Sequence, residues 1–172
     1  MLNNLKKIFQ GSKASELNIK AAVSGQVINL ENCGDPVFES KSLGDGVAII
    51  PSDDIVYAPC DGKVTLVHQS KHAIVITTKN GDDIMVHSGL DTVSLDGEPF
   101  EVYVAVGDTV TEGDKIQKMD RDIIAKNNLK DTVITVVMKN TYGVATALSN
   151  NTEVEGGKDN VMTLGGSGDL KK

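Results

Sequence analysis

Short apolar runs alternate with polar turn residues along most of the chain, and this pattern predicts strands rather than helices. The runs are rich in Val, Ile and Thr, and turn signals recur about every eight to twelve residues, as they do in antiparallel sandwiches and barrels. The predicted strands are Val47–Ile50, Ile55–Tyr57, Val64–His68, Ala73–Thr78, Ile84–His87, Val102–Val106, Lys115–Lys118, Val133–Met138 and Val161–Leu164. One short helical segment is expected at Arg121–Lys126, because Asp120 precedes it and aspartate caps helices well. We therefore expect an all-β fold, an antiparallel β-sandwich or barrel with at most short helical turns.

Two pairs of segments repeat a similar pattern within the chain. Ala21–Val27 (AAVSGQV) resembles Ala58–Val64 (APCDGKV), and Val106–Asp114 resembles Val154–Asp159. Self-similarity of this kind is typical of a duplicated structural unit. The sequence therefore predicts a duplicated β-unit that closes on itself, with chance recurrence of Gly-turn-Val patterns as the alternative.

The strongest local signal is a β-hairpin around Asn80-Gly81, a dipeptide typical of tight turns between strands. If these two residues form the turn, the register places Gly89 opposite His72, where the missing side chain would leave room for a ligand. His72 and His87 then share a face as diagonal neighbours, roughly 7–8 Å apart at the backbone. A loop of three residues would instead place the two histidines on opposite faces. The hairpin thus predicts a site with two converging imidazoles.

These histidines are candidates for nucleophilic chemistry. His87 lies at the end of a predicted strand, so its backbone is held while its ring reaches solvent. Imidazole titrates near neutrality, and a phosphoryl group on its nitrogen stays reactive for onward transfer. His72 would hydrogen-bond the phosphate oxygens, and Ser70, on the same predicted face, would orient the His72 ring. The third histidine, His68, lies roughly 13 Å from His72 at strand rise and is expected to be an ordinary exposed residue.

Acidic residues near this site are predicted to bind a partner. Asp91 follows His87 through a short loop, and Asp45 lies in a Gly-Asp-Gly segment, which is most often only a turn. A carboxylate repels phosphate, so these two acids would instead bind a basic partner protein. The apolar surround of the site would come from Val47, Ile49 and Met85, which sequence alone does not distinguish from plain core. These three residues are predicted to contact the partner together with the two acids.

The length and composition fit one globular domain with a tail at each end. Of the 172 residues, 40% are hydrophobic, and the predicted domain spans residues 19–164. Residues 1–18 form the N-terminal tail, and residues 165–172, rich in Gly and charge, are expected to be disordered. Within the first tail, residues 1–9 read MLNNLKKIF, which predicts either a frayed end or a short amphipathic helix. Such a helix would contact an anionic membrane surface weakly, or a partner.

Charge and cysteine usage narrow the function classes. A net charge of -7 and an aromatic content of 3% argue against binding nucleic acid, which needs basic surface and stacking rings. Cys33 and Cys60 lack the spacing of metal ligands and are expected to be free thiols in a reducing cytosol. No apolar run approaches the length of a transmembrane span, so a cytoplasmic location is expected.

Several segments resemble the glucose-specific enzyme IIA family of the bacterial sugar phosphotransferase system. They are PVFESKSLGDGVAIIPSD (Pro36–Asp53), YAPCDGKVTLV (Tyr57–Val67), SKHAIVITT (Ser70–Thr78), MVHSGLDTVSLDGEPF (Met85–Phe100) and AVGDTVTEGDKIQKMD (Ala105–Asp120). The similarity covers nearly the whole chain, and HSGLDTV with KHA upstream is its most specific part.

The resemblance implies an antiparallel β-sandwich that works as a phosphoryl carrier, with no cofactor. By this resemblance His87 accepts phosphate from the phosphocarrier HPr, His72 stabilises the phosphate, and Ser70 supports His72. Acids matching Asp45 and Asp91 flank the site and contact partner proteins. The phosphate would then pass to a cysteine of an enzyme IIB domain of a sugar permease, and a regulatory role could be added to this transfer.

One departure from the family pattern and one alternative function stay open. Ser88 stands where relatives usually carry a larger apolar residue, which would alter partner docking. The alternative is a zinc hydrolase with His72 and His87 as metal ligands, which needs a third ligand such as Asp45 or Asp91 and an activated water.

Overall fold

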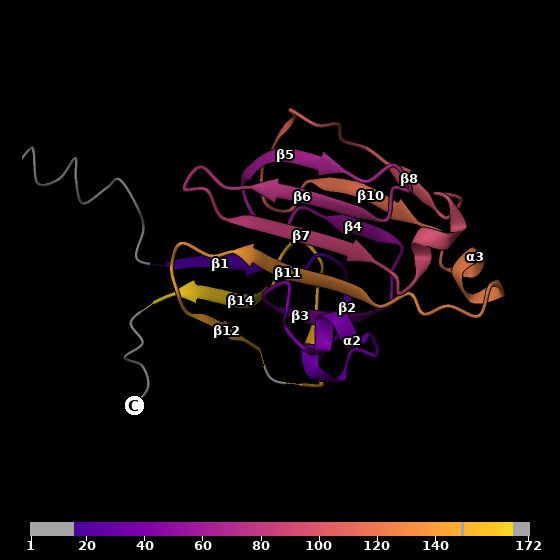
Figure 1. The fold of residues 1–172 in the computed structure, drawn as a ribbon, viewed down its shortest axis with the longest axis horizontal. Helices are drawn as coiled ribbons and strands as arrows, with labels where there is room; N and C mark the ends of the chain where they lie inside the picture. Colours follow the sequence, from indigo (N-terminus) through magenta and orange to yellow (C-terminus); the bar gives the residue numbers. More distant parts are fainter. Residues whose placement is uncertain (1–15, 149, 167–172) are drawn as a thin grey trace, which may run out of the picture.

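The computed structural model describes residues 16–148 and 150–166, and nearly all of its regular structure is β-strand (Figure 1). Eight strands form the main sheet: β2 (Gly25–Asn29), β3 (Asp45–Pro51), β5 (Gly62–Val67), β6 (Ala73–Thr77), β7 (Asp83–Ser88), β9 (Thr109–Val110), β11 (Val133–Lys139) and β13 (Glu153–Val154). Their spatial order is β13-β2-β3-β11-β7-β6-β5-β9, and all neighbours are antiparallel. The predicted all-β antiparallel fold is confirmed.

Two smaller antiparallel sheets complete the sandwich. One contains β1 (Glu16–Lys20), β14 (Asn160–Gly165) and β12 (Ala145–Ala147), and the other contains β4 (Ile55–Tyr57), β10 (Lys115–Met119) and β8 (Phe100–Val102). Residues 16–18 and 165, which were assigned to the predicted tails, belong to β1 and β14. The predictions for residues 1–15, including the amphipathic segment 1–9, and for residues 167–172 lie outside the described residues.

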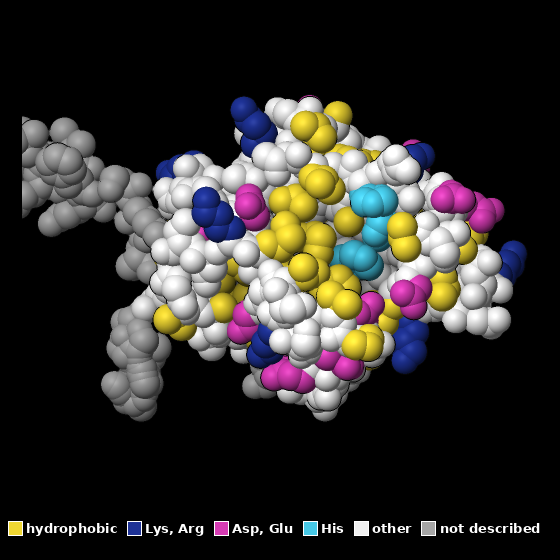
Figure 2. Space-filling model, viewed as in Figure 1, with side chains coloured by type: hydrophobic (Ala, Val, Ile, Leu, Met, Phe, Trp, Pro, Cys, Tyr) yellow, Lys and Arg dark blue, Asp and Glu magenta, His cyan; other side chains and the backbone are white. Residues whose placement is uncertain are grey.

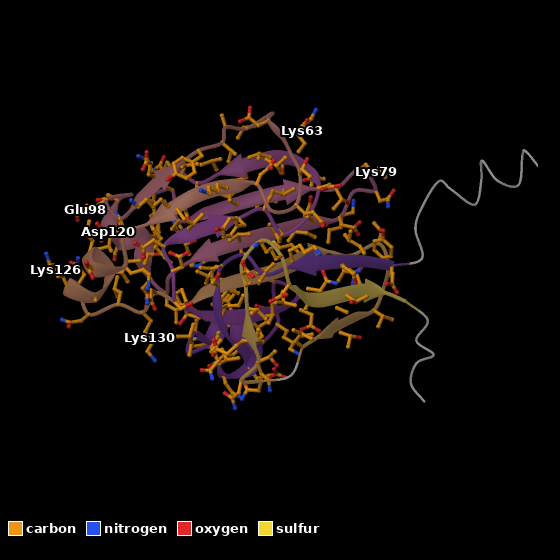
Figure 3. The ribbon with its side chains drawn as sticks, turned by 180° about the vertical axis from the view of Figure 1, so that it is seen from behind. Lys63, Lys79, Glu98, Asp120, Lys126 and Lys130 are labelled. Carbon is orange, nitrogen blue, oxygen red and sulfur yellow. The ribbon has the colours of Figure 1, made fainter. Side chains whose placement is uncertain are left out.

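The helical elements are short, as expected from the sequence. They are η1 (Leu30–Asn32), α2 (Pro36–Glu39), η2 (Thr92–Leu95) and α3 (Arg121–Lys126). The predicted bounds of α3 are confirmed, and the Asp120 carboxylate caps the helix by accepting from the Asp122 and Ile123 amides at 3.1 and 3.2 Å. Figure 3 shows Asp120 and Lys126 at this helix, at the opposite end of the molecule from Lys63 and Lys79.

Two equivalent sets of hydrogen bonds support the predicted duplication. Ala21 and Ala58 each donate an amide to an aspartate carbonyl and accept one from a glycine. With the donor first, the pairs are Ala21–Asp159 (2.8 Å), Ala58–Asp114 (2.8 Å), Gly157–Ala21 (2.7 Å) and Gly113–Ala58 (2.9 Å). In the same way, β2 pairs with β13 in one unit and β5 pairs with β9 in the other. The chain is therefore built from two related β-units.

The two units differ in the connection that follows their first strand. Between β2 and β3 the chain forms η1 and α2, whereas between β5 and β6 it makes only a tight turn. That turn carries His68 and His72, and α2 carries Phe38. The differing connections therefore place different side chains around the same face of the main sheet.

The main sheet separates two hydrophobic clusters. The larger cluster fills the sandwich between this sheet and the two smaller ones, and includes Ile74, Ile76, Ile84, Val86, Val56, Ile116, Met162 and Leu164. The smaller cluster lies on the opposite face of the same strands and includes Ala48, Ala73, Val75, Met85, Ile134 and Phe38. His87 pairs with Ala73 on one side and Ile134 on the other, so its side chain faces the smaller cluster.

The β6–β7 hairpin forms where it was predicted, but its register differs by one residue. His87 pairs with Ala73 rather than with the next residue along the strand. The loop has three residues between Thr78 and Asp82, and its last residue, Gly81, has a φ of +91°. A loop of this kind ends in a glycine bulge, which the Asn-Gly dipeptide accommodates as well as a two-residue turn. The predicted register is therefore wrong.

Candidate active site

Three imidazole rings lie in a row at the ends of β5, β6 and β7. The His72 and His87 ring centroids are 4.8 Å apart with planes at 83°, and those of His68 and His72 are 4.5 Å apart at 63°. Figure 2 shows the histidines together on one face of the molecule, next to a patch of hydrophobic side chains. The structure therefore brings the predicted pair into contact and adds the third histidine to it.

The pair forms even though the predicted register is wrong, because His72 precedes β6 and lies in a bend. Lys71 has a φ of +62°, which turns the chain just before His72. The Ser88 amide donates to the His72 carbonyl at 2.8 Å, so Ser88 and not Gly89 lies opposite His72. Strand alternation does not set the direction of a side chain in a bend, and the two rings meet despite the three-residue loop.

His68 belongs to the site, and the prediction that it is remote from His72 is wrong. Its amide donates to the Ala73 carbonyl at 2.9 Å, and its carbonyl accepts from the Lys71 amide at 2.8 Å. Its Nδ1 accepts from the Ser70 amide at 3.0 Å. The chain therefore turns back between His68 and His72 instead of continuing as a strand. The polar run QSK between two apolar segments is the signal that could have indicated this turn.

Both rings of the central pair are neutral at pH 7. Burial lowers the pKa of His72 to about 4, with a smaller contribution from the two neighbouring imidazoles. Burial also lowers the pKa of His87, while the Gly89 backbone and the carboxylates of Asp35 and Asp91 raise it in part. A neutral imidazole keeps a free lone pair on one nitrogen, which is the requirement for a nucleophile.

The shape of the site leaves one nitrogen of His87 open to a reactant. The Nδ1 atoms of His72 and His87 are buried and have no hydrogen-bond partner among the described residues. The Phe38 ring from α2 packs edge-on against His87 with a centroid distance of 4.9 Å. Because His87 is only half-buried as a whole, the nitrogen that can meet a reacting group is Nε2.

The loop after His87 is tightly built around Gly89. This residue has a φ of +80°, and a Cβ placed on it would lie 2.3 Å from the Thr92 Cγ2 atom. Its amide donates to the Thr132 carbonyl at 2.9 Å, and the Thr92 hydroxyl donates to the Ser88 carbonyl at 2.6 Å. Gly89 is therefore needed for its backbone conformation and for close packing, and it does not make room for a ligand opposite His72.

The predicted role of Ser70 as the residue that orients His72 stays a prediction. Ser70 is buried, but among the described residues no hydrogen bond joins it to the His72 ring. Its amide is bound to His68 instead.

Of the acids near the site, two raise the pKa of His87. These are Asp91, which was predicted, and Asp35, which was not. Asp35 caps α2 by accepting from the Val37 amide at 2.9 Å, and the Asp-Pro pair at the start of this helix is a signal that could have located it. Asp45 is the first residue of β3, and its Oδ1 atom forms an ion pair with Lys41 Nζ at 3.3 Å.

The apolar residues predicted to surround the site divide between the two faces of the main sheet. Met85 shares the face of His87 and belongs to the smaller cluster. Val47 and Ile49 are each 1% exposed and belong to the larger core, so the prediction that they bind a partner is wrong. Ala48, which lies between them, faces the histidine side and belongs to the smaller cluster.

Ser88 was expected to alter partner docking, but it is 1% exposed and its hydroxyl donates to Gln117 Oε1 at 2.6 Å. It therefore cannot contact a partner directly. Cys33 and Cys60 are free and buried, and burial raises the pKa of both thiols, to about 12 for Cys60. Neither thiol is therefore an activated nucleophile.

The described part of the chain contains no group of three or more His, Cys, Asp or Glu residues arranged to hold a metal ion. The geometry therefore gives no support to the zinc hydrolase alternative. None of the described helices is long and apolar enough to span a membrane.

Comparison with known proteins agrees with a phosphoryl-transfer site. Residues 17–142 match the family model of the phosphoenolpyruvate-dependent sugar phosphotransferase system, EIIA 1. The PTS system glucose-specific EIIA component of Bacillus cereus is 43% identical over 158 residues, which cover 87% of this chain and 95% of that protein. The PTS system glucoside-specific EIICBA component of Staphylococcus carnosus is 36% identical over 140 residues, which cover 81% of this chain and 20% of that protein.

The fold comparison agrees with these sequence matches. The solved structure of glucose permease IIA from Mycoplasma capricolum has a TM-score of 0.82 and 35% identity to this chain, and the match covers 88% of this chain and 97% of that one. The chain therefore belongs to the EIIA 1 family of the phosphoenolpyruvate-dependent sugar phosphotransferase system and is a phosphocarrier component of that system.

Proposed function

We propose that His87 accepts the phosphoryl group on Nε2. The observation that carries this proposal is the contact between His72 and His87, whose ring centroids are 4.8 Å apart. Both rings have a lowered pKa, and both Nδ1 atoms are buried. The Nε2 lone pair of His87 forms a bond to phosphorus as the phosphorus–nitrogen bond of the phosphorylated donor breaks, and the donor imidazole keeps that electron pair. Little covalent chemistry is required of the protein, so positioning supplies most of the catalysis.

His72 acts as a neutral hydrogen-bond donor to the phosphate oxygens. Its pKa of about 4 keeps it uncharged at pH 7, so it can stabilise the phosphoryl group without binding it as tightly as a cation would. A carrier needs this balance because it must release the group again. Ser70 supports His72 through the turn that holds both residues.

The donor is the phosphocarrier HPr, and the acceptor is the cysteine of an enzyme IIB domain of a sugar permease. Both dock on the face that carries the histidines, where Met85 and Val75 belong to the smaller cluster and Leu66 is 44% exposed. Asp91 and Asp45 contact basic groups of these partners, which fits the net charge of -7. The exchange takes place in the cytoplasm, and the change of charge at His87 on phosphorylation could also regulate other partners.

Glucose is the sugar that we assign to the pathway. The Bacillus cereus relative is a glucose-specific component, whereas the Staphylococcus carnosus relative is glucoside-specific. The higher identity and the nearly complete coverage of the glucose-specific protein favour glucose.

Transfer of label from phosphoenolpyruvate through enzyme I and HPr tests the assignment of the nucleophile. We expect acid-labile label on the wild type and on His68→Gln, and none on His87→Ala. On His72→Gln, label should form but pass to the IIB cysteine at least about tenfold more slowly, because a donor to the phosphate is lost. Label on His87→Ala would show that another residue accepts the phosphoryl group.

The sugar is tested with the same phosphorylated protein. Its label is offered to IIB domains of a glucose permease and of a glucoside permease, and the faster transfer identifies the partner. A faster transfer to the glucoside-specific domain would overturn the glucose assignment and leave the role of His87 intact.

A further inference from the structure

Two buried polar side chains connect the segments that carry the central histidines. Ser88 follows His87 on β7, and Gln117 lies on β10 in a different sheet; each is 1% exposed. The Ser88 hydroxyl donates to Gln117 Oε1 at 2.6 Å, and Gln117 Nε2 donates to the Lys71 carbonyl at 2.7 Å. Lys71 directly precedes His72. One amide group therefore bridges the side chain of Ser88, next to His87, and the backbone next to His72.

The chemistry of the three groups determines the direction of each hydrogen bond. A carbonyl oxygen only accepts, so the NH₂ group of Gln117 must face Lys71. This leaves Oε1 of Gln117 facing Ser88, whose hydroxyl must then donate. Removing any one member leaves at least one buried polar atom without its partner, which is costly in an apolar core.

The position of the Lys71 carbonyl affects the orientation of His72. It belongs to the same peptide plane as the His72 amide, in a turn where Lys71 has a φ of +62°. The His72 Nδ1 atom has no hydrogen-bond partner among the described residues, so the direction of the ring depends on its backbone and on ring packing. A rotation of this peptide plane would change the distance and angle between His72 and His87.

We propose that Gln117, together with Ser88, is a positioning residue for phosphoryl transfer. It holds the Lys71–His72 peptide against β7, so that the His72 ring keeps its place beside His87. The inference rests on the proposed function of His87. It also explains why a polar pair lies among apolar neighbours. An apolar pair of the same size would fill the same space and would need no hydrogen bonds. Transfer between positioned groups is sensitive to such support, since a misplacement of about 1 Å can slow a reaction on the order of a hundredfold.

The test compares Gln117→Met and Ser88→Ala with the wild type. Methionine keeps the length of glutamine but removes both hydrogen bonds of the bridge, whereas Ser88→Ala removes only one. For Gln117→Met we expect kcat for transfer from phospho-HPr to fall about tenfold, with KM unchanged because the docking face is untouched. The ring ¹⁵N resonances of His72 should shift in the same variant, and Ser88→Ala should show both effects more weakly.

Two further variants separate positioning from simple loss of stability. Ile116→Val lies on the same strand and removes buried packing without touching the bridge, so we expect a lower unfolding temperature with unchanged kcat. Gln117→Glu can donate to the Lys71 carbonyl only when its carboxyl is protonated, and its burial favours that form. The ratio of its rate to the wild-type rate should therefore rise as the pH is lowered from 8 to 6.

A wild-type kcat and unshifted His72 resonances in Gln117→Met would overturn the proposal. If Gln117→Met does not fold, the same two measurements on Ser88→Ala decide the question. If the wild type accepts no phosphate from phospho-HPr, the proposed function fails instead. The His72 resonances then still report, without any activity, whether Gln117 positions the ring.

Discussion

At the scale of single residues, the site depends on imidazoles that are kept neutral by burial. A protonated imidazole has no lone pair to offer to phosphorus, so a carrier that works near neutral pH gains from a lowered pKa. His72 and His87 both have a lowered pKa, and in both the first cause is burial. The same burial has a consequence for folding, because a proton on either ring must be placed in poorly hydrated surroundings.

The pKa of His72 predicts that the protein loses stability in acid. Its value of about 4 lies below the ordinary 6.5, so between these values the unfolded chain binds more protons than the folded one. The free energy of unfolding should therefore fall as the pH drops from 6.5 toward 4, with a contribution from His72 of about 2 kcal/mol at pH 4.5. Urea unfolding of the wild type and His72→Gln at pH 7 and 4.5 measures this contribution. An equal pH dependence in both proteins would contradict it.

Gly89→Ala is expected to destabilise the protein by about 2 kcal/mol or more and to slow phosphoryl transfer. The new Cβ would meet the Thr92 Cγ2 atom at 2.3 Å, in a backbone that already has a φ of +80°. Gly81→Ala is the matched control: Gly81 has a φ of +91°, but a Cβ placed on it would come no closer than 3.9 Å, to Lys139 Nζ. Urea unfolding of both variants separates the steric clash from the backbone strain. Equal losses would show that the clash is relieved by movement of Thr92.

At the scale of elements, the sequence predicted well those features that depend only on residues close to one another along the chain. The helix α3 begins and ends at the predicted residues, and the Asp120 side chain caps its first turn. Strand β4 also has its predicted bounds. The hairpin register, in contrast, depends on the loop type, and Asn80-Gly81 fits two loops that differ by one residue.

The face of each central strand could not be predicted from its pattern. Hydrophobic clusters cover both faces of the main sheet, so segments such as Val47–Ile50 and Ala73–Thr77 are apolar without alternation. The pattern therefore does not show that Val47 and Ile49 face the larger core. The first three residues of β1, 16–18, were not predicted to belong to the domain, because the pairing partner of this strand, β14, lies at the other end of the chain.

Asp120→Ala tests the cap of α3. The loss of two hydrogen bonds to amides of the first turn should lower the free energy of unfolding by about 1 kcal/mol. Asp120→Asn keeps an acceptor oxygen at the cap and should lose less. The cap involves none of the residues that contact the histidine rings, so phosphoryl transfer should be unaffected in both variants. A loss as large for Asn as for Ala would show that charge and not capping is responsible.

At the scale of the whole molecule, the two related units meet through equivalent glycines. A Cβ on Gly113 would lie 3.0 Å from the Gly157 carbonyl oxygen, and one on Gly157 would lie 3.3 Å from the Gly113 Cα and 3.0 Å from the Tyr57 ring. The backbones of the two units approach closely here, and no side chain fits between them. The sequence echoes indicated the duplication, but they did not indicate that the two glycine turns touch.

Gly157→Ala should therefore destabilise the protein more than Gly107→Ala, by about 1–2 kcal/mol. Both glycines have a positive φ, +75° and +100°, but a Cβ on Gly107 would meet nothing within 4 Å. Thermal unfolding of both variants measures the difference. Equal unfolding temperatures would show that the junction between the units can open slightly at no cost.

The difference between the β2–β3 and β5–β6 connections has a consequence for the rate of phosphate transfer through the pathway. All three histidines of the chain belong to one connection and the strand beside it, so the proposed phosphoacceptor has no counterpart in the other β-unit. The phosphoryl donor and the phosphoryl acceptor must then bind at the same site, and the donor has to dissociate before the acceptor can bind. The rate of phosphate transfer through the pathway is then limited by how quickly each partner dissociates, so tighter binding of either partner would slow the transfer.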